Sequence, residues 1–139
     1  LFRSVCTKLK AKLDQPCAVL TSALYSADIM TGVLRQMSMI VTSRYHAAVL
    51  SMDRAIPIVA ISMDERLDCL MKDCGLDGSY LLHTNSKDLE SKIYACMNMA
   101  DDERVMISET IRKQVEIYIR KLDYMGRFLK KYVKYHFKD

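Results

Sequence analysis

The chain has 139 residues, of which 50% are hydrophobic and 27% are charged, and this is the composition of a single globular domain. No apolar stretch approaches the roughly 18 residues of a membrane span, and the five cysteines form no CxxC pair, so we expect a cytoplasmic protein with reduced thiols and no metal site. The net charge of +4 arises in residues 126–139 and the rest is nearly neutral, which argues against a nucleic-acid-binding domain.

The first part of the chain contains two helical patterns. A charged segment predicts a helix over residues 1–14 that ends before Pro16. Ser26 is a typical N-cap, and apolar residues at helical spacing after it predict a helix from Ala27 to Met37. Because the chain does not begin with methionine, we expect it to be part of a longer protein.

The middle of the chain alternates short apolar runs with helical patterns. The predicted elements are a strand at 39–41, a helix at 45–52, a strand at 57–61, a helix at 64–73 that Gly75 stops, a strand at 80–82, and a helix from Asn85 or Ser86 to Met99. Alternation of this kind is typical of a parallel sheet whose strands are buried on both faces. We therefore predict an α/β fold, a Rossmann-like parallel sheet flanked by helices, over residues 1–100.

From residue 101 to 139 the pattern changes to one long helical extension. The acidic residues Asp101 to Glu103 suit a helix N-terminus, where the helix dipole favours negative charge. Apolar residues then recur at alternating spacings of four and three, and Gly126 is a candidate for a kink. The members of this heptad seam are Ile111, Val115, Tyr118, Leu122, Met125, Leu129 and Tyr132.

The heptad seam predicts either a long helix packed along a domain or a coiled-coil homodimer through the C-terminal helix. The basic residues of the tail suit a solvated face or a peripheral contact with an anionic membrane surface.

Ionisable residues follow two of the predicted strands. Ser43, Arg44 and His46 come after the first strand, and Arg66 comes after the second. Ligands of open parallel sheets bind at the carboxyl ends of the strands, where helix N-termini favour anions. Arginine binds carboxylate or phosphate through its forked donors, and histidine transfers protons near neutral pH. These residues therefore predict an anion site that contains an acid–base group.

The segment "VTSRYHAAVLSMDRAIPIVAISMDERLDCLMKDCGL", residues 41–76, resembles the polysaccharide pyruvyl transferase family. The resemblance lies in an apolar strand, an Arg-x-His motif, a helix of small residues, and a strand that begins at proline, ends in Ile-Ser and precedes aspartate and a basic residue. It implies the C-terminal half of a glycosyltransferase-B-like two-domain fold, whose N-terminal domain is missing from this chain. Members of the family move a pyruvyl group from phosphoenolpyruvate to a sugar of a cell-surface polysaccharide.

The resemblance also implies roles for individual residues. Its Arg-x-His motif falls on Arg44 and His46, which would bind an anionic group of the donor and transfer the proton. Its basic residue after the next strand, usually lysine, falls on Arg66, which would bind the other anionic group, and Ser43 is a further substrate contact. Met63 stands where the family often has an aromatic residue. Phosphoenolpyruvate is the donor and no cofactor or metal is implied.

The implied acceptor is a sugar or a lipid-linked saccharide, which places the reaction in the cytoplasm or at the inner face of the membrane. The chain by itself is expected to be inactive, because one wall of the cleft is absent.

Two other functions also fit the pattern. The donor domain of a nucleotide-sugar glycosyltransferase would bind a diphosphate at the same strand ends. Such domains usually add a late carboxylate that binds ribose, and Glu90 is only a weak candidate for it. The heptad seam, in turn, suits a non-catalytic helical interaction module.

Overall fold

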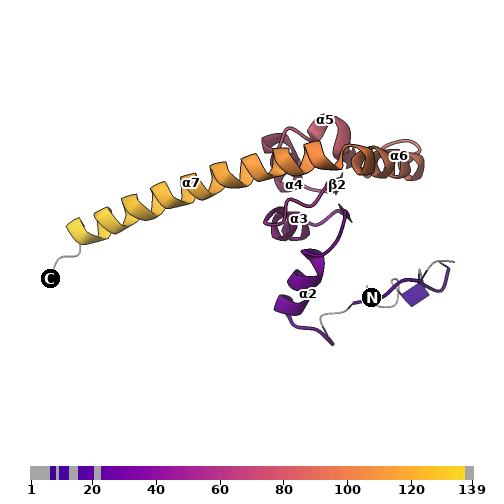
Figure 1. Cartoon of the computed structure of the whole chain (residues 1–139), viewed down its shortest axis with the longest axis horizontal. Coiled ribbons are helices and arrows are strands. Elements are labelled where there is room, and N and C mark those ends of the chain that lie inside the picture. Colours follow the sequence, from indigo (N-terminus) through magenta and orange to yellow (C-terminus); the bar gives the residue numbers. More distant parts are fainter. Residues whose placement is uncertain (1–6, 9, 13–15, 21–22, 137–139) are drawn as a thin grey trace.

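The computed structural model describes residues 7–8, 10–12, 16–20 and 23–136 of the chain. Its elements in chain order are α2 (Ala27–Leu34), β1 (Ile40–Thr42), α3 (Tyr45–Met52), β2 (Ile58–Ser62), α4 (Glu65–Asp73), α5 (Asp77–Tyr80), β3 (Leu81–His83), α6 (Leu89–Asp102) and α7 (Arg104–His136). Figure 1 shows a small body of short elements from which α7 extends. The helix predicted over residues 1–14 lies largely outside the described residues, although residues 7, 8 and 10 are helical.

A three-stranded parallel sheet with the order β1-β2-β3 forms the centre of the body. The first residues of β1 and β2, Ile40 and Ile58, are partners in the register. The central strand β2 is covered on both faces, because Ile58, Val59 and Ala60 are all buried although neighbouring side chains of a strand point to opposite faces. The predicted α/β fold with a helix-flanked parallel sheet is therefore confirmed.

Helices α3 and α4 each begin just past the carboxyl end of the strand before them. Helix α3 packs on β1, α4 packs on β2, and α6 packs on β2 and β3. The sequence predicts the starts of α2 and α4 and the end of α4, because these boundaries depend on local signals. Ser26 caps α2 and Asp64 caps α4, while Gly75 ends α4 with a φ of 66°, a left-handed conformation that favours glycine.

Two predictions on either side of β3 are wrong. Helix α6 begins after Asp88 and not at Asn85 or Ser86, because the Ser86 N–H donates to the His83 carbonyl, 2.9 Å away, in the turn that follows β3. The short helix α5, which connects α4 to β3, was not predicted at all. No side chain of the described residues caps either helix, and before α6 the residues Asn85, Ser86 and Asp88 are all of types that commonly cap, so residue type alone does not mark its start.

The junction between the last two helices also differs from the prediction. Asp101 and Asp102 end α6, and the last helix starts only at Arg104. From there α7 runs through Gly126 to His136 as one uninterrupted helix.

The first half of α7 is fastened to the body by apolar packing and by two hydrogen bonds. Ile107 and Ile111 are completely buried. The Tyr80 hydroxyl donates to Glu103, next to the start of α7, at 2.7 Å. Further along, the Tyr118 hydroxyl donates to Asp73 at the end of α4, also at 2.7 Å. These contacts fix the direction in which α7 leaves the body.

The heptad seam divides into a packed half and an exposed half. Ile111 is buried, and Val115 and Tyr118 are partly buried against the core. Further along, Leu122 and Leu129 are 65% and 64% exposed. Figure 1 shows why, since the second half of α7 extends beyond the other elements. None of the described helices combines the length and the apolar character that crossing a bilayer requires.

The cysteines of the described residues, Cys17, Cys69, Cys74 and Cys96, are all free thiols. Burial raises the pKa of Cys74 to about 11, so this thiol stays protonated and packs as a small apolar side chain.

Alkaline unfolding should report the bond between Tyr80 and Glu103. Burial, together with this bond, raises the pKa of Tyr80 to about 12, above the usual value of about 10. The folded state therefore holds the phenol proton more tightly, and this stabilisation is complete below pH 10 and is lost as the pH rises from about 10 to 12. We expect Tyr80→Phe to lower the free energy of unfolding by about 1 kcal/mol at pH 7 and to flatten its fall between pH 10 and 12.

The measurement is thermal or urea unfolding across this pH range, with Tyr94→Phe as the control because Tyr94 is exposed. If Tyr80→Phe follows the same pH curve as the parent chain, the bond does not contribute as described.

Candidate anion-binding site

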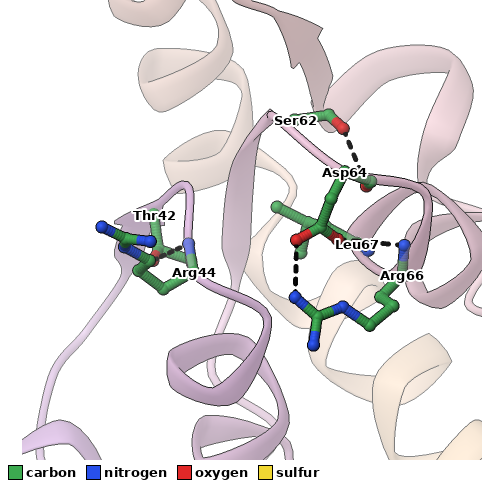
Figure 2. Close-up of polar contacts among 6 residues, drawn as sticks. All are labelled: Thr42, Arg44, Ser62, Asp64, Arg66 and Leu67. Atoms are coloured by element: carbon green, nitrogen blue, oxygen red, sulfur yellow. Dashed lines mark hydrogen bonds and ion pairs between the residues drawn. The ribbon is translucent and has the colours of Figure 1, made fainter.

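Two turns of equal length follow β1 and β2 at the same edge of the sheet. Each strand ends in a hydroxyl-bearing residue, Thr42 or Ser62, and the helix N-cap comes two residues later, at Arg44 or Asp64. In the first turn the Arg44 N–H donates to Thr42 Oγ1 at 2.9 Å, and in the second the Ser62 hydroxyl donates to the Asp64 carbonyl at 3.2 Å (Figure 2). The two turns therefore present two helix N-termini side by side, on adjacent parallel strands.

At α4 this N-terminus already holds a negative charge. The Asp64 carboxylate accepts from the N–H groups of Arg66 and Leu67, at 3.0 and 3.3 Å, and from the Arg66 guanidinium at 2.8 Å (Figure 2). The hydrogen bond from the guanidinium lowers the pKa of Asp64, and the same contact raises the pKa of Arg66. Asp64 thus caps the helix and is the counter-ion of Arg66.

At α3 the same position carries the opposite charge. Its N-cap is Arg44, and no side chain of the described residues caps this helix. The Arg44 carbonyl accepts from the N–H groups of Ala47 and Ala48, so the helix begins normally. Arg44 and His46 are both exposed at this end. The N-terminus of α3 therefore combines the positive end of a helix dipole with two basic side chains, an arrangement that attracts an anion.

The structure separates the predicted site residues into two groups. Figure 2 shows the Arg44 side chain directed away from the Asp64–Arg66 pair. The Arg66 guanidinium carbon instead lies 5.7 Å from the centre of the Tyr45 ring. The His46 ring also contacts Tyr45 in an edge-to-face arrangement, with ring centres 5.6 Å apart and an interplanar angle of 79°. Tyr45 thus lies against both His46 and Arg66.

Of the four predicted site residues, Ser43 is the least informative, since it is partly buried in the turn between β1 and α3. Arg44 and His46 share one helix N-terminus, and Arg66 is bound to Asp64 next to it. Sequence reasoning missed that Asp64 both caps α4 and forms the ion pair with Arg66, although an aspartate just before a helical pattern is a recognisable N-cap signal. It also treated Tyr45 only as a spacer, because an aromatic contact across two helices has no local signature.

His83 is a further residue at this edge, at the end of β3 and paired in the register with Ser62. It lines a hollow of ≈ 360 Å³ together with Asp64, Glu65 and Asp68. Carboxylates outnumber cations in this hollow, which makes it unsuitable for an anion. The described residues contain no group of His, Cys, Asp and Glu side chains that could hold a metal ion.

Comparison of the chain with protein-family models, with curated proteins and with solved structures finds no match.

The contrast between the two helix N-termini predicts an unusual stability change. Arg44→Asp gives α3 the carboxylate cap that Asp64 provides for α4, and an acidic group near a helix N-terminus also suits the dipole. We expect this substitution to raise the free energy of unfolding by about 0.5–1 kcal/mol, measured by urea denaturation.

The matched control is Arg54→Asp, which makes the same charge change just beyond the other end of α3, where the dipole disfavours an acidic side chain. A loss of stability in Arg44→Asp would show that the arginine, and not a missing carboxylate, holds this turn together.

Proposed function

We propose that this chain is the phosphoenolpyruvate-binding, C-terminal domain of a pyruvyl transferase that acts on a sugar of a cell-surface polysaccharide. The observation that supports it best is the difference between the two turns. One helix N-terminus at the sheet edge is occupied by the carboxylate of Asp64, whereas its neighbour carries Arg44 and His46 and has no carboxylate cap in the described structure. The positive end of the α3 dipole together with two exposed basic side chains suits an external anion.

Phosphoenolpyruvate matches this arrangement because it carries a phosphate and a carboxylate. One of these groups would lie at the N-terminus of α3, bound by backbone N–H groups and by Arg44. The other would be shared by Arg66, which has five N–H donors, only some of which bond to Asp64. Met63, in the turn between β2 and α4, is exposed at this edge of the sheet.

His46 would supply the proton that starts the transfer. Protonation of the methylene carbon of phosphoenolpyruvate makes C2 electron-deficient, a sugar hydroxyl attacks C2 and loses its proton, and the bond from C2 to the phosphate oxygen breaks. Loss of phosphate leaves C2 electron-deficient again, and a second sugar hydroxyl attacks it and loses its proton to close a cyclic ketal. Ser43, in the same turn as Arg44, would contact the substrate through its hydroxyl or its backbone.

The proposal includes the second, N-terminal domain of a glycosyltransferase-B-like fold. That domain would supply the other wall of the cleft and bind the sugar or lipid-linked saccharide acceptor, in the cytoplasm or at the inner face of the membrane. The proposal calls for no cofactor, because the donor itself carries both the pyruvyl group and the leaving group.

A titration of the chain with phosphoenolpyruvate, followed by nitrogen–proton correlation NMR, tests the anion site directly. We expect the backbone resonances of Tyr45 and His46 to shift, because their N–H groups lie in the first turn of α3. Arg44→Gln should weaken binding by about 10- to 100-fold, the effect of losing a charged hydrogen bond. Arg54→Gln removes the same charge from the opposite end of α3 and should leave binding nearly unchanged.

The ligands of the titration separate the possible donors. Inorganic phosphate should compete weakly with phosphoenolpyruvate at the same resonances. A nucleotide sugar that binds more tightly than phosphoenolpyruvate would favour the glycosyltransferase alternative. If no anion shifts these resonances, the site is not an anion site, and the helical interaction module is the better description.

The role of His46 requires the two-domain enzyme. If His46 transfers the proton, His46→Gln should reduce turnover by about 10²–10⁴-fold with little change in the affinity for phosphoenolpyruvate. Steady-state kinetics and direct donor titration measure the two quantities separately. Near-normal turnover with weakened donor binding would instead make His46 a binding residue.

A further inference from the structure

The second half of α7 carries an apolar stripe that is largely exposed. The stripe consists of Ile119, Leu122, Met125, Leu129, Tyr132 and Val133, which are between 48% and 65% exposed. Its members recur at spacings of three and four, so they lie on one side of the helix. A continuous apolar side on an extended helix is a binding surface unless something covers it.

The α7 stripe faces the same side as the buried contacts of the first half of the helix. Ile111, Val115 and Tyr118 pack on the body, and Leu122 and Met125 continue the same heptad positions. The stripe therefore points toward the side on which the body lies, and the body stands at one end of it (Figure 1).

Because the stripe and the body lie on the same side of α7, the body limits which partners can cover the stripe. A flat membrane laid along it would have to pass through the body, because both lie on the same side of α7. A second α7 running parallel would put its own first half in the space that the body occupies. An antiparallel helix avoids this clash, because its first half lies beyond the C-terminal end of α7.

We propose that the α7 stripe is the interface of an antiparallel homodimer formed by a second copy of this chain. The proposal does not depend on the reaction catalysed. In an antiparallel pair of helices, each a position of one helix lies beside a d position of the other. This places Leu122 beside Tyr132 of the second copy and Met125 beside Leu129 of the second copy. One stripe thus supplies both sides of a two-fold symmetric contact.

The same register brings the end of the second helix to an apolar hollow. This hollow, of ≈ 650 Å³, lies where α7 leaves the body, and its lining includes Tyr45, Val49, Leu70 and Leu122. In the proposed register Tyr118, at the same place, is opposite His136 of the second copy. The stripe and the hollow are therefore continuous, and the second helix would cover both.

Analytical ultracentrifugation of the chain tests the dimer. We expect a concentration-dependent dimer, and Leu129→Glu should raise its dissociation constant by roughly 100-fold, because each dimer loses this buried leucine twice. Tyr124→Glu is the matched control, since Tyr124 is exposed on the opposite side of the same half of α7 and should leave the dimer intact. A chain that is still monomeric at about 100 µM has a Kd well above the value expected for a specific dimer. This result would overturn the proposal. So would a dimer that Leu129→Glu does not weaken.

Disulfide cross-linking tests the orientation. A mixture of L122C and Y132C chains should cross-link to each other, with the parent chain as the control for its own cysteines. L122C alone should not, because the two copies of this position are ten residues, or roughly 15 Å, apart in the antiparallel register. Efficient cross-linking of L122C alone would show a parallel pair and would overturn the proposed geometry.

Sedimentation with vesicles that contain phosphatidylserine tests whether the stripe binds a membrane instead. We expect the chain not to sediment with them. A monomeric chain that does sediment, and that loses this property in Leu129→Glu, would assign the stripe to a membrane and overturn the homodimer.

Discussion

The central strand β2 is packed on both faces, and a strand in that position imposes the arrangement of its neighbours. Ile58 and Ala60 face one layer and Val59 faces the other, and all three are buried. A shift of one residue along β2 would exchange the two faces and break both layers of packing. Because β1 and β3 pair with β2 in parallel, the residues that follow all three strands emerge at one edge.

At that edge two turns of the same shape carry opposite charges. Asp64 caps the N-terminus of α4 and is the counter-ion of Arg66, which stabilises the fold and leaves only the other guanidinium N–H groups of Arg66 for an external anion. Arg44 does the reverse at α3, where the best local choice for stability would be a small acceptor such as aspartate or serine. Arg44 is thus an unfavourable N-cap, whereas Asp64 at the equivalent position of the next turn is a favourable one. A residue that is locally unfavourable for stability is typical of a functional position.

Helix α7 shows how one sequence pattern can serve two different contacts. Its seam has the same heptad spacing throughout, yet only the first half has the body to pack against. The hydrogen bonds of Tyr80 to Glu103 and of Tyr118 to Asp73 hold that half in place, so the direction of the exposed half is determined by the body. The shape of the body, and not the stripe itself, then selects which partner orientation is sterically allowed.

The sequence by itself determined the features whose causes are local. Continuous apolar runs indicate strands buried on both faces, and the caps Ser26, Asp64 and Gly75 mark helix ends, since each acts on backbone groups within a few residues. The chain order also predicted Arg44, His46 and Arg66 just past adjacent strands. Only the tertiary structure decided that Arg44 points away from the Asp64–Arg66 pair, and that Tyr45 contacts Arg66 across two helices. Only the tertiary structure decided, too, which half of the heptad seam is buried, because burial depends on residues far away in the chain.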